Sequence, residues 1–196
     1  MEHKIYIIIS LSREIKKKLS KHTLKLPDLP IHWTKRENLQ ISLSFLGKIK
    51  DESIAEIINS VEEVSANHKP FFLELNRICY GPTEENPKMV LARGVKSKEI
   101  GKLKNDLEGR LLSIPKQKPS IFKEGLSPYV TLGRIKKSDF RKISPEERPL
   151  IDKNISIKFE VNSIDIMECE IESTGAQYTL LQSIGLGKNQ ENLESW

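Results

Sequence analysis

Two short stretches of the chain carry the same small pattern: "LQISLSFLG", Leu39 to Gly47, and "LSPYVTLGR", Leu126 to Arg134. In each, a polar residue, an apolar residue, a hydroxyl residue and a leucine follow one another, at 40–43 and at 129–132. The alternation of polar and apolar residues predicts a strand in both places. A chain that repeats such a strand can hold the two copies in equivalent positions of two lobes.

Residues two apart in a strand share a face, so each stretch is expected to have a polar front and an apolar back. Gln40 and Ser42 form the first front, and Tyr129 and Thr131 form the second. The expected backs are Leu39, Ile41, Leu43 and Phe45 in the first stretch, and Val130 and Leu132 in the second. If both fronts face one cleft, four polar side chains surround one small ligand. The alternation alone is more typical of two ordinary strands with one side toward water.

The composition is that of an ordinary globular protein: 196 residues, 37% of them hydrophobic and 30% charged, are enough to bury one core. The formal charge of +5 and a pI near 9.1 favour an anionic, phosphate-rich partner, because a basic surface attracts anions at long range. The two cysteines, Cys79 and Cys169, lie in apolar runs without CxxC spacing. We therefore expect buried free thiols, with neither a disulfide nor a zinc site.

The first residues, "MEHKIYIIISLSREIKKK", combine a short apolar run with charged residues. They show neither a small-residue cleavage site nor membrane-spanning length, so we expect a cytoplasmic protein that does not bind a membrane. No long apolar stripe is left over once the predicted helices are packed, so we also expect a monomer.

Strand and helix patterns mix along the chain without regular βαβ alternation. Apolar or alternating runs predict strands at 4–12, 37–47, 70–81, 88–96, 127–135, 154–173 and 176–186. Apolar residues three or four apart predict helices after residue 13, after a cap at Asp51 or Ser53, and after a cap at Ser97. This order favours an α+β fold with mainly antiparallel sheets. We expect one domain over residues 1–187 and a disordered polar tail over 188–196.

With their flanks and in their order, "ENLQISLSFLGKI" and "LSPYVTLGRIKK" resemble the signature strands of the two-histidine (2H) phosphoesterase superfamily. The resemblance is strongest to its RNA 2′,3′-cyclic phosphodiesterases, also called 2′-5′ RNA ligases, whose motifs look like "ENLHITLKFLG" and "PHVTLAR". "KIYIIISLS" is similar to the family's first strand, "IHWTKRENL" to the lead-in to its first motif, and "ESTGAQYTLL" to its closing strand. The resemblance implies two pseudo-symmetric lobes of mainly antiparallel sheet, with helices packed outside and a central cleft.

The chain departs from the family at the place where each motif begins with a histidine. Gln40 begins the first motif and Tyr129 the second, whereas the hydroxyl positions survive as Ser42 and Thr131. No motif position is occupied by any of the four histidines, which are His3, His22, His32 and His68. His32 precedes the first motif strand by eight residues. For this histidine, approach to the cleft and packing on a loop both stay open.

The resemblance implies a reaction in which one histidine activates water, the other protonates the leaving oxygen of a 2′,3′-cyclic phosphate, and no metal or other cofactor takes part. Imidazole suits both roles because its pKa is about 6.5. The hydroxyls of Ser42 and Thr131 would hold the non-bridging phosphate oxygens. A glutamine cannot exchange protons usefully near pH 7, and a tyrosine phenol, with a pKa of about 10, is a poor base. Both residue types still donate hydrogen bonds, so the cleft can keep its ligand while losing its turnover.

Further residues gain candidate roles from the same resemblance. Arg134 occupies the family's usual "AR" place, where a charge at the site and a structural ion pair are open alternatives. Tyr178 in "GAQYTLL" and Phe122 before "KEGLSPYV" are candidates for stacking on a base, or for core packing. Four basic residues flank the motifs, either as guides for an RNA backbone or as solvated surface charge: Lys35, Arg36, Lys136 and Lys137.

Three hypotheses about function follow. The first is a working phosphodiesterase in which Tyr129 acts as the acid and a group such as His32 activates water. The second is a catalytically silent relative that binds RNA ends, 2′,3′-cyclic phosphates or nucleotides. The third is a protein-interaction scaffold with a vestigial cleft. The sequence favours the second, because the motif strands keep their polar donors and lose the groups that exchange protons.

Overall fold

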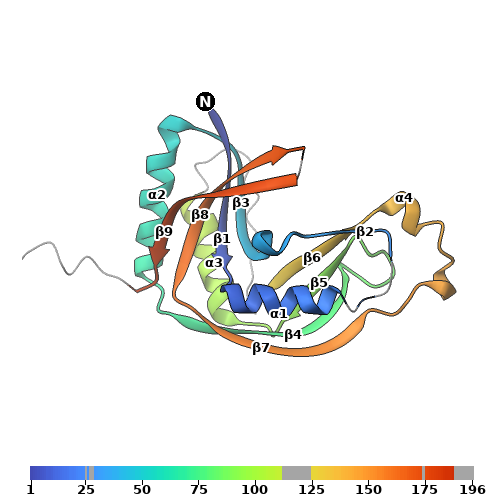
Figure 1. The fold of residues 1–196 in the computed structure, drawn as a ribbon. Helices are drawn as coiled ribbons and strands as arrows, with labels where there is room; N and C mark the ends of the chain where they lie inside the picture. The colour runs from blue at the N-terminus through green and yellow to red at the C-terminus, as the bar shows by residue number, and fades with distance from the viewer. Residues whose placement is uncertain (25, 27–28, 112–124, 174, 188–196) are drawn as a thin grey trace, which may run out of the picture.

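The computed structural model describes residues 1–24, 26, 29–111, 125–173 and 175–187. Within them, two antiparallel sheets and four helices form an α+β fold, as the sequence predicts (Figure 1). The predicted tail over 188–196 and the stacking candidate Phe122 lie outside the described residues.

The first sheet has the strand order β3-β1-β8-β9. Its strands are β1 (Glu2–Ser10), β3 (Gln40–Lys50), β8 (Ser163–Glu172) and β9 (Gly175–Gly185). Helices α2 (Asp51–Ala66) and α3 (Lys98–Arg110) contact this sheet and each other. Ile5, Ile7 and Ile9 of β1 are buried in the same core cluster as the apolar residues of both helices. The other face of this sheet is therefore free to line a cleft.

The second sheet has the strand order β2-β6-β5-β4-β7. Its strands are β2 (Ile31–Trp33), β4 (Phe71–Gly81), β5 (Met89–Gly94), β6 (Tyr129–Ile135) and β7 (Asp152–Val161). Helix α1 (Arg13–Thr23) contacts β6, and the short α4 (Lys137–Phe140) follows that strand. The strands predicted at 70–81 and 88–96 are confirmed as β4 and β5, which pair antiparallel from Gly81 opposite Met89.

The long run predicted as strand at 154–173 divides between the two sheets. Strand β7 of the second sheet ends at Val161, and strand β8 of the first sheet begins at Ser163. Asn162 alone separates the two strands. The carbonyl oxygen of Asn162 accepts a 2.8 Å hydrogen bond from the backbone N–H of Leu186, which follows β9. This short connection ties the two sheets together beside the end of β9.

One of the two predicted helix caps is confirmed and the other is wrong. Ser97 caps α3, because its Oγ accepts a 3.3 Å hydrogen bond from the backbone N–H of Ile100. Helix α2 starts directly at the end of β3, so Lys50 is its N-cap residue and Asp51 lies already in the first turn. Its carboxylate still lies near the positive end of the helix dipole.

No helix in the described part of the chain is long and apolar enough to cross a membrane. Cys79 and Cys169 are buried free thiols, in agreement with the sequence-based expectation.

Candidate functional site

The first motif strand presents Gln40 and Ser42 on one face of β3. Gln40 lies opposite Ser10 of β1, and Ser42 lies opposite Ile8. Directly opposed residues of an antiparallel pair project to the same face. Gln40 and Ser42 therefore lie on the side of the sheet away from Ile7 and Ile9. Gln40 is half-buried and Ser42 is exposed.

Phe45 does not lie on the buried back of this strand, where the alternation placed it. Leu39, Ile41 and Leu43 are buried there as predicted, but Phe45 is 49% exposed. The pairing of β3 with β1 skips Leu43 and again Leu46, and each bulge shifts the alternation by one residue. The bulge at Leu43 thus buries Ser44 and places Phe45 opposite Tyr6, on the face of Ser42.

The second motif strand presents its predicted polar front. Val130 and Leu132 of β6 are fully buried in the core, whereas Tyr129 is 44% exposed and Thr131 is half-buried. Thr131 lies opposite Leu91 of β5, a buried residue outside the main core cluster. Tyr129 and Thr131 therefore share a face that points away from the core.

The two motif strands meet although they belong to different sheets. β3 and β6 contact each other at the junction of the sheets (Figure 1). Burial raises the pKa of Tyr6 and of Tyr178, and the positive charge of Arg134 opposes the rise in both. Arg134, from β6, therefore lies close to two aromatic residues of the first sheet. The contact between β3 and β6 therefore brings the two motif strands, and with them Arg134, to the junction of the sheets.

The four polar side chains at the junction are not engaged with one another or with their surroundings. Within the described residues, the side-chain polar groups of Gln40, Ser42, Tyr129 and Thr131 make no hydrogen bond. No described carboxylate lies within ion-pair distance of Arg134, so the structure gives no support to a structural ion pair for this arginine. The arrangement offers neutral donors and one positive charge to an anion.

An aromatic cluster, formed by Tyr6, Phe45 and Tyr178, lies on the same face of the first sheet. The ring centroids of Tyr6 and Phe45 are 4.4 Å apart, and Tyr178 packs edge-on against Tyr6 at 5.6 Å. Tyr178 is half-buried, which agrees with both of its predicted roles. Sequence reasoning missed Tyr6 and Phe45. Tyr6 interrupts an otherwise aliphatic run, but only the bulges reveal Phe45.

The remaining predicted residues lie around the junction. His32 of β2 is exposed and lies opposite Arg134, on the same face of the second sheet as Thr131. The four flanking basic residues are all exposed: Lys35, Arg36, Lys136 and Lys137. Among the residues that the structure describes, no three His, Cys, Asp or Glu side chains form a group that could hold a metal ion.

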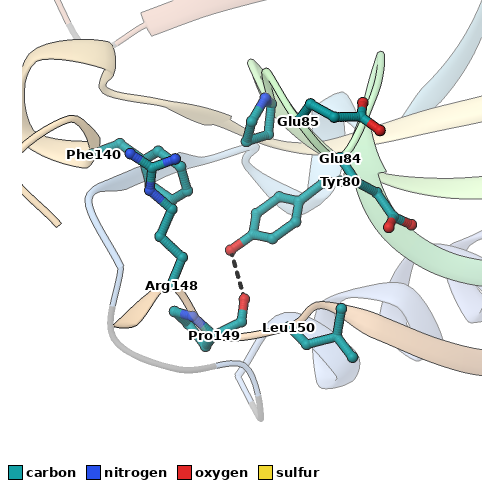
Figure 2. Close-up of a pocket in the computed structure, with 8 residues that line it drawn as sticks. Tyr80, Glu84, Glu85, Phe140, Arg148, Pro149 and Leu150 are labelled. Atoms are coloured by element: carbon teal, nitrogen blue, oxygen red, sulfur yellow. Dashed lines mark hydrogen bonds between the residues drawn. The ribbon is translucent and has the colours of Figure 1, made fainter. Parts of the chain in front are cut away.

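A pocket of about 250 Å³ lies elsewhere, at the end of β4 (Figure 2). Its lining consists of Tyr80, Glu84, Glu85, Pro87, Phe140, Arg148, Pro149 and Leu150. The Tyr80 hydroxyl donates a 3.0 Å hydrogen bond to the Pro149 carbonyl, and the Arg148 guanidinium lies 4.9 Å from the Phe140 ring centroid. No motif residue lines this pocket, so it is separate from the candidate site.

Comparison with known proteins finds similar sequences. A family model described as LigT like phosphoesterase matches residues 9–91. An RNA 2′,3′-cyclic phosphodiesterase of Aquifex aeolicus is 29% identical over 160 residues, which are 79% of this chain and 81% of the relative. Another, of Methanocaldococcus jannaschii, is 22% identical over 180 residues, 91% of this chain and 98% of the relative.

Solved structures share the fold over almost the whole chain. The protein TT0787 of Thermus thermophilus matches with a TM-score of 0.75 and 19% identity, over 94% of this chain and 98% of that one. LigT of E. coli, complexed with 3′-AMP, matches with a TM-score of 0.76 and 16% identity, over 96% of this chain and 100% of that one. In its motif region, the chain is thus similar to the LigT-like phosphoesterases, and over most of its length it is similar to RNA 2′,3′-cyclic phosphodiesterases and shares the two-sheet fold of LigT.

Proposed function

We propose that the cleft between β3 and β6 binds the phosphate end of an RNA or of a nucleotide, and that hydrolysis in this cleft is strongly impaired. The observation that carries the proposal is the set of four polar side chains on two motif strands that meet, none of them engaged within the described residues. E. coli LigT has been crystallised with phosphate, with 3′-AMP and with NADP+, which supports a nucleotide phosphate as the ligand class here.

Ser42 and Thr131 are the proposed phosphate-binding pair. Their hydroxyls approach from different sheets and donate hydrogen bonds to two non-bridging oxygens of one phosphate. The amide of Gln40 and the phenol of Tyr129 donate to the remaining oxygens, and Arg134 adds positive charge. A hydrogen bond to a charged group contributes about 1.5–3 kcal/mol, so even two of these contacts give measurable affinity.

Gln40 and Tyr129 stand where the resemblance places the two catalytic histidines, and this is the reason to expect impaired turnover. Opening a cyclic phosphate requires water to lose a proton as its oxygen bonds to phosphorus. The ribose oxygen that leaves must gain a proton as its bond to phosphorus breaks. A neutral amide accepts no proton at pH 7, and a phenol serves at best as the acid. Loss of both groups costs about 10⁴ to 10⁸ in rate if they act independently, and less if they are coupled.

The aromatic cluster is the proposed binding surface for the base of the same ligand. Phe45 keeps half of its surface exposed on the face of Ser42, with Tyr6 and then Tyr178 packed behind it. Base stacking on an aromatic ring tolerates any base. Tyr178 of β9 thus supports the proposed stacking ring, Phe45, through its contact with Tyr6.

Titration of the protein with inorganic phosphate and with 3′-AMP tests this function. The double variant S42A/T131V should bind both ligands at least about 10-fold more weakly, because two hydrogen bonds to the phosphate are lost. The matched control is T179V, which removes an exposed hydroxyl opposite Glu168, on the other face of the first sheet. A wild-type protein that binds neither ligand supports the scaffold hypothesis instead.

A second candidate function, slow cyclic phosphodiesterase activity, is favoured by the position of His32. This histidine is exposed, next to Arg134 and on the face of Thr131, so it is the described histidine best placed to activate water for attack on a bound phosphate. An RNA oligomer that ends in a 2′,3′-cyclic phosphate is the substrate to use. If H32Q abolishes a measurable wild-type rate without weakening 3′-AMP binding, the second candidate holds.

A further inference from the structure

An arginine of the second sheet stands beside Tyr129 without a role in the proposed phosphate site. Arg93 of β5 lies directly opposite Tyr129 of β6, and opposite Arg77 of β4 on its other side. Opposed residues in antiparallel strands project to the same face. Tyr129, Arg93 and Arg77 therefore form a row that leads away from the motif strand across the cleft face of the sheet.

The two arginines of this row differ in their surroundings. Arg77 is already neutralised, with Asp152 at 2.5 Å from its Nε and Glu84 at 3.2 Å from one terminal nitrogen. Arg93 donates a 3.3 Å hydrogen bond to the carbonyl of Pro82, and no carboxylate of the described chain lies within ion-pair distance of it. Arg93 thus carries the uncompensated charge of the row.

Arg93 is also half-buried, so its charge has lost part of its water. It lies above buried Cys79: burial raises the pKa of this thiol, and the charges of Arg93 and Arg77 oppose the rise. A partly desolvated cation with no anion beside it costs free energy unless a ligand supplies the anion. A guanidinium is well matched to a phosphate, because its planar fork can donate two parallel hydrogen bonds.

The position of Arg93 sets the distance between two anion sites. Neighbouring strands lie about 4.8 Å apart, so Arg93 stands one strand beyond Tyr129, on the far side of β6 from β2. When the lengths of the Tyr129 and Arg93 side chains are included, this separation is of the order of the distance between consecutive phosphates in a nucleic-acid strand.

We propose that Arg93 binds a second phosphate, the internucleotide phosphate next to the terminal one, and that the ligand is therefore an oligonucleotide rather than a mononucleotide. This inference rests on the proposed function, since the terminal phosphate must occupy the cleft between β3 and β6. It adds a direction to that function: the RNA chain runs from the motif strands across β5 toward β4.

The experiment compares two probes, adenosine 3′-monophosphate and the adenylyl dinucleotide with a 3′-phosphate, by isothermal titration at several salt concentrations. The wild-type protein should bind the dinucleotide about 10-fold more tightly, the gain from one charge-assisted contact. R93Q should abolish this advantage while leaving mononucleotide affinity within about twofold, and should reduce the salt slope for the dinucleotide by about 0.7. R93K, which keeps the charge, should retain most of the advantage.

The control is R110Q, which removes a distant arginine that pairs with Glu63 at the end of α3. This variant should leave the dinucleotide advantage unchanged. A wild-type protein that binds both probes equally overturns the second phosphate site and leaves the proposed function intact, and so does an R93Q variant that weakens both probes to the same extent. If neither probe binds, the proposed function itself fails. Circular dichroism of R93Q confirms that the variant is folded.

Discussion

The two sheets present different chemistry to the junction where they meet. The face of the first sheet that carries Ser42 is aromatic, with Tyr6, Phe45 and Tyr178 packed together from three strands. The corresponding face of the second sheet is cationic, with Arg134 and Arg93 on neighbouring strands and without described ion-pair partners. Each sheet contributes one hydroxyl from its motif strand.

This difference suggests a division of labour in the proposed ligand site. Stacking recognises the base on the first sheet, and positive charge recognises the phosphates on the second, while Ser42 and Thr131 hold the shared terminal phosphate between them. The two motif strands, β3 and β6, thus repeat one sequence pattern but have different neighbouring residues, aromatic for β3 and cationic for β6. Neither motif strand carries a group that exchanges protons readily near pH 7, so we expect this site to bind its ligand without efficient turnover.

The largest expected effect comes from restoring histidine on both sides of the junction. The double variant Q40H/Y129H should hydrolyse an RNA oligomer ending in a 2′,3′-cyclic phosphate at least about 10²-fold faster than the wild-type protein, because an acid and a base return to the positions of the family motif. The release of the 2′- or 3′-phosphate end is followed by chromatography. A folded double variant that still binds 3′-AMP but gains no activity contradicts a preserved catalytic geometry.

A smaller effect should separate the aromatic sheet from the cationic one. F45L should weaken 3′-AMP binding about fivefold to tenfold, since stacking of one base is lost, and should leave inorganic phosphate binding unchanged. The matched control is F72L, because Phe72 is also an exposed strand phenylalanine, at 59%, but packs under Lys158 on β7. Equal losses for phosphate and nucleotide in F45L, or equal losses in both variants, contradict the division of labour.

The smallest effect concerns stability at a site outside the cleft. Hydrogen bonds that the His3 ring donates to Glu168 and Asp51 raise its pKa above the ordinary value of 6.5. Each ring nitrogen lies 2.5 Å from one carboxylate oxygen, so both contacts require the protonated ring. A raised folded-state pKa contributes stability that is complete below pH 6.5 and is lost as the pH rises through the folded value.

The variant H3Q tests this contribution. Its thermal unfolding midpoint should fall below that of the wild-type protein at pH 5.5, and the difference should be smaller at pH 8, because the contribution declines once the pH exceeds 6.5. The affinity for 3′-AMP should not change at either pH, because His3 is remote from the motif residues along β1. A constant difference between the two midpoints across this pH range rules out the protonated contact.

The sequence predicted the elements that carry periodic apolar residues and the shared faces of the motif strands. Val130 and Leu132 are buried and Tyr129 and Thr131 face away from the core, because β6 keeps its alternation through these positions. Phe45 was misplaced because the bulge at Leu43 arises from the pairing of β3 with β1, which no local pattern encodes. The division of 154–173 between the sheets and the row formed by Arg93 likewise depend on which strands become neighbours.

The most direct test of the central claim is a crystal structure of the protein with 3′-AMP. The account predicts that one phosphate lies between the motif strands, with separate oxygens about 3 Å from the Ser42 Oγ and the Thr131 Oγ1, and with the base against Phe45. A phosphate bound away from both hydroxyls, or two hydroxyls that face separate regions of solvent, would contradict it.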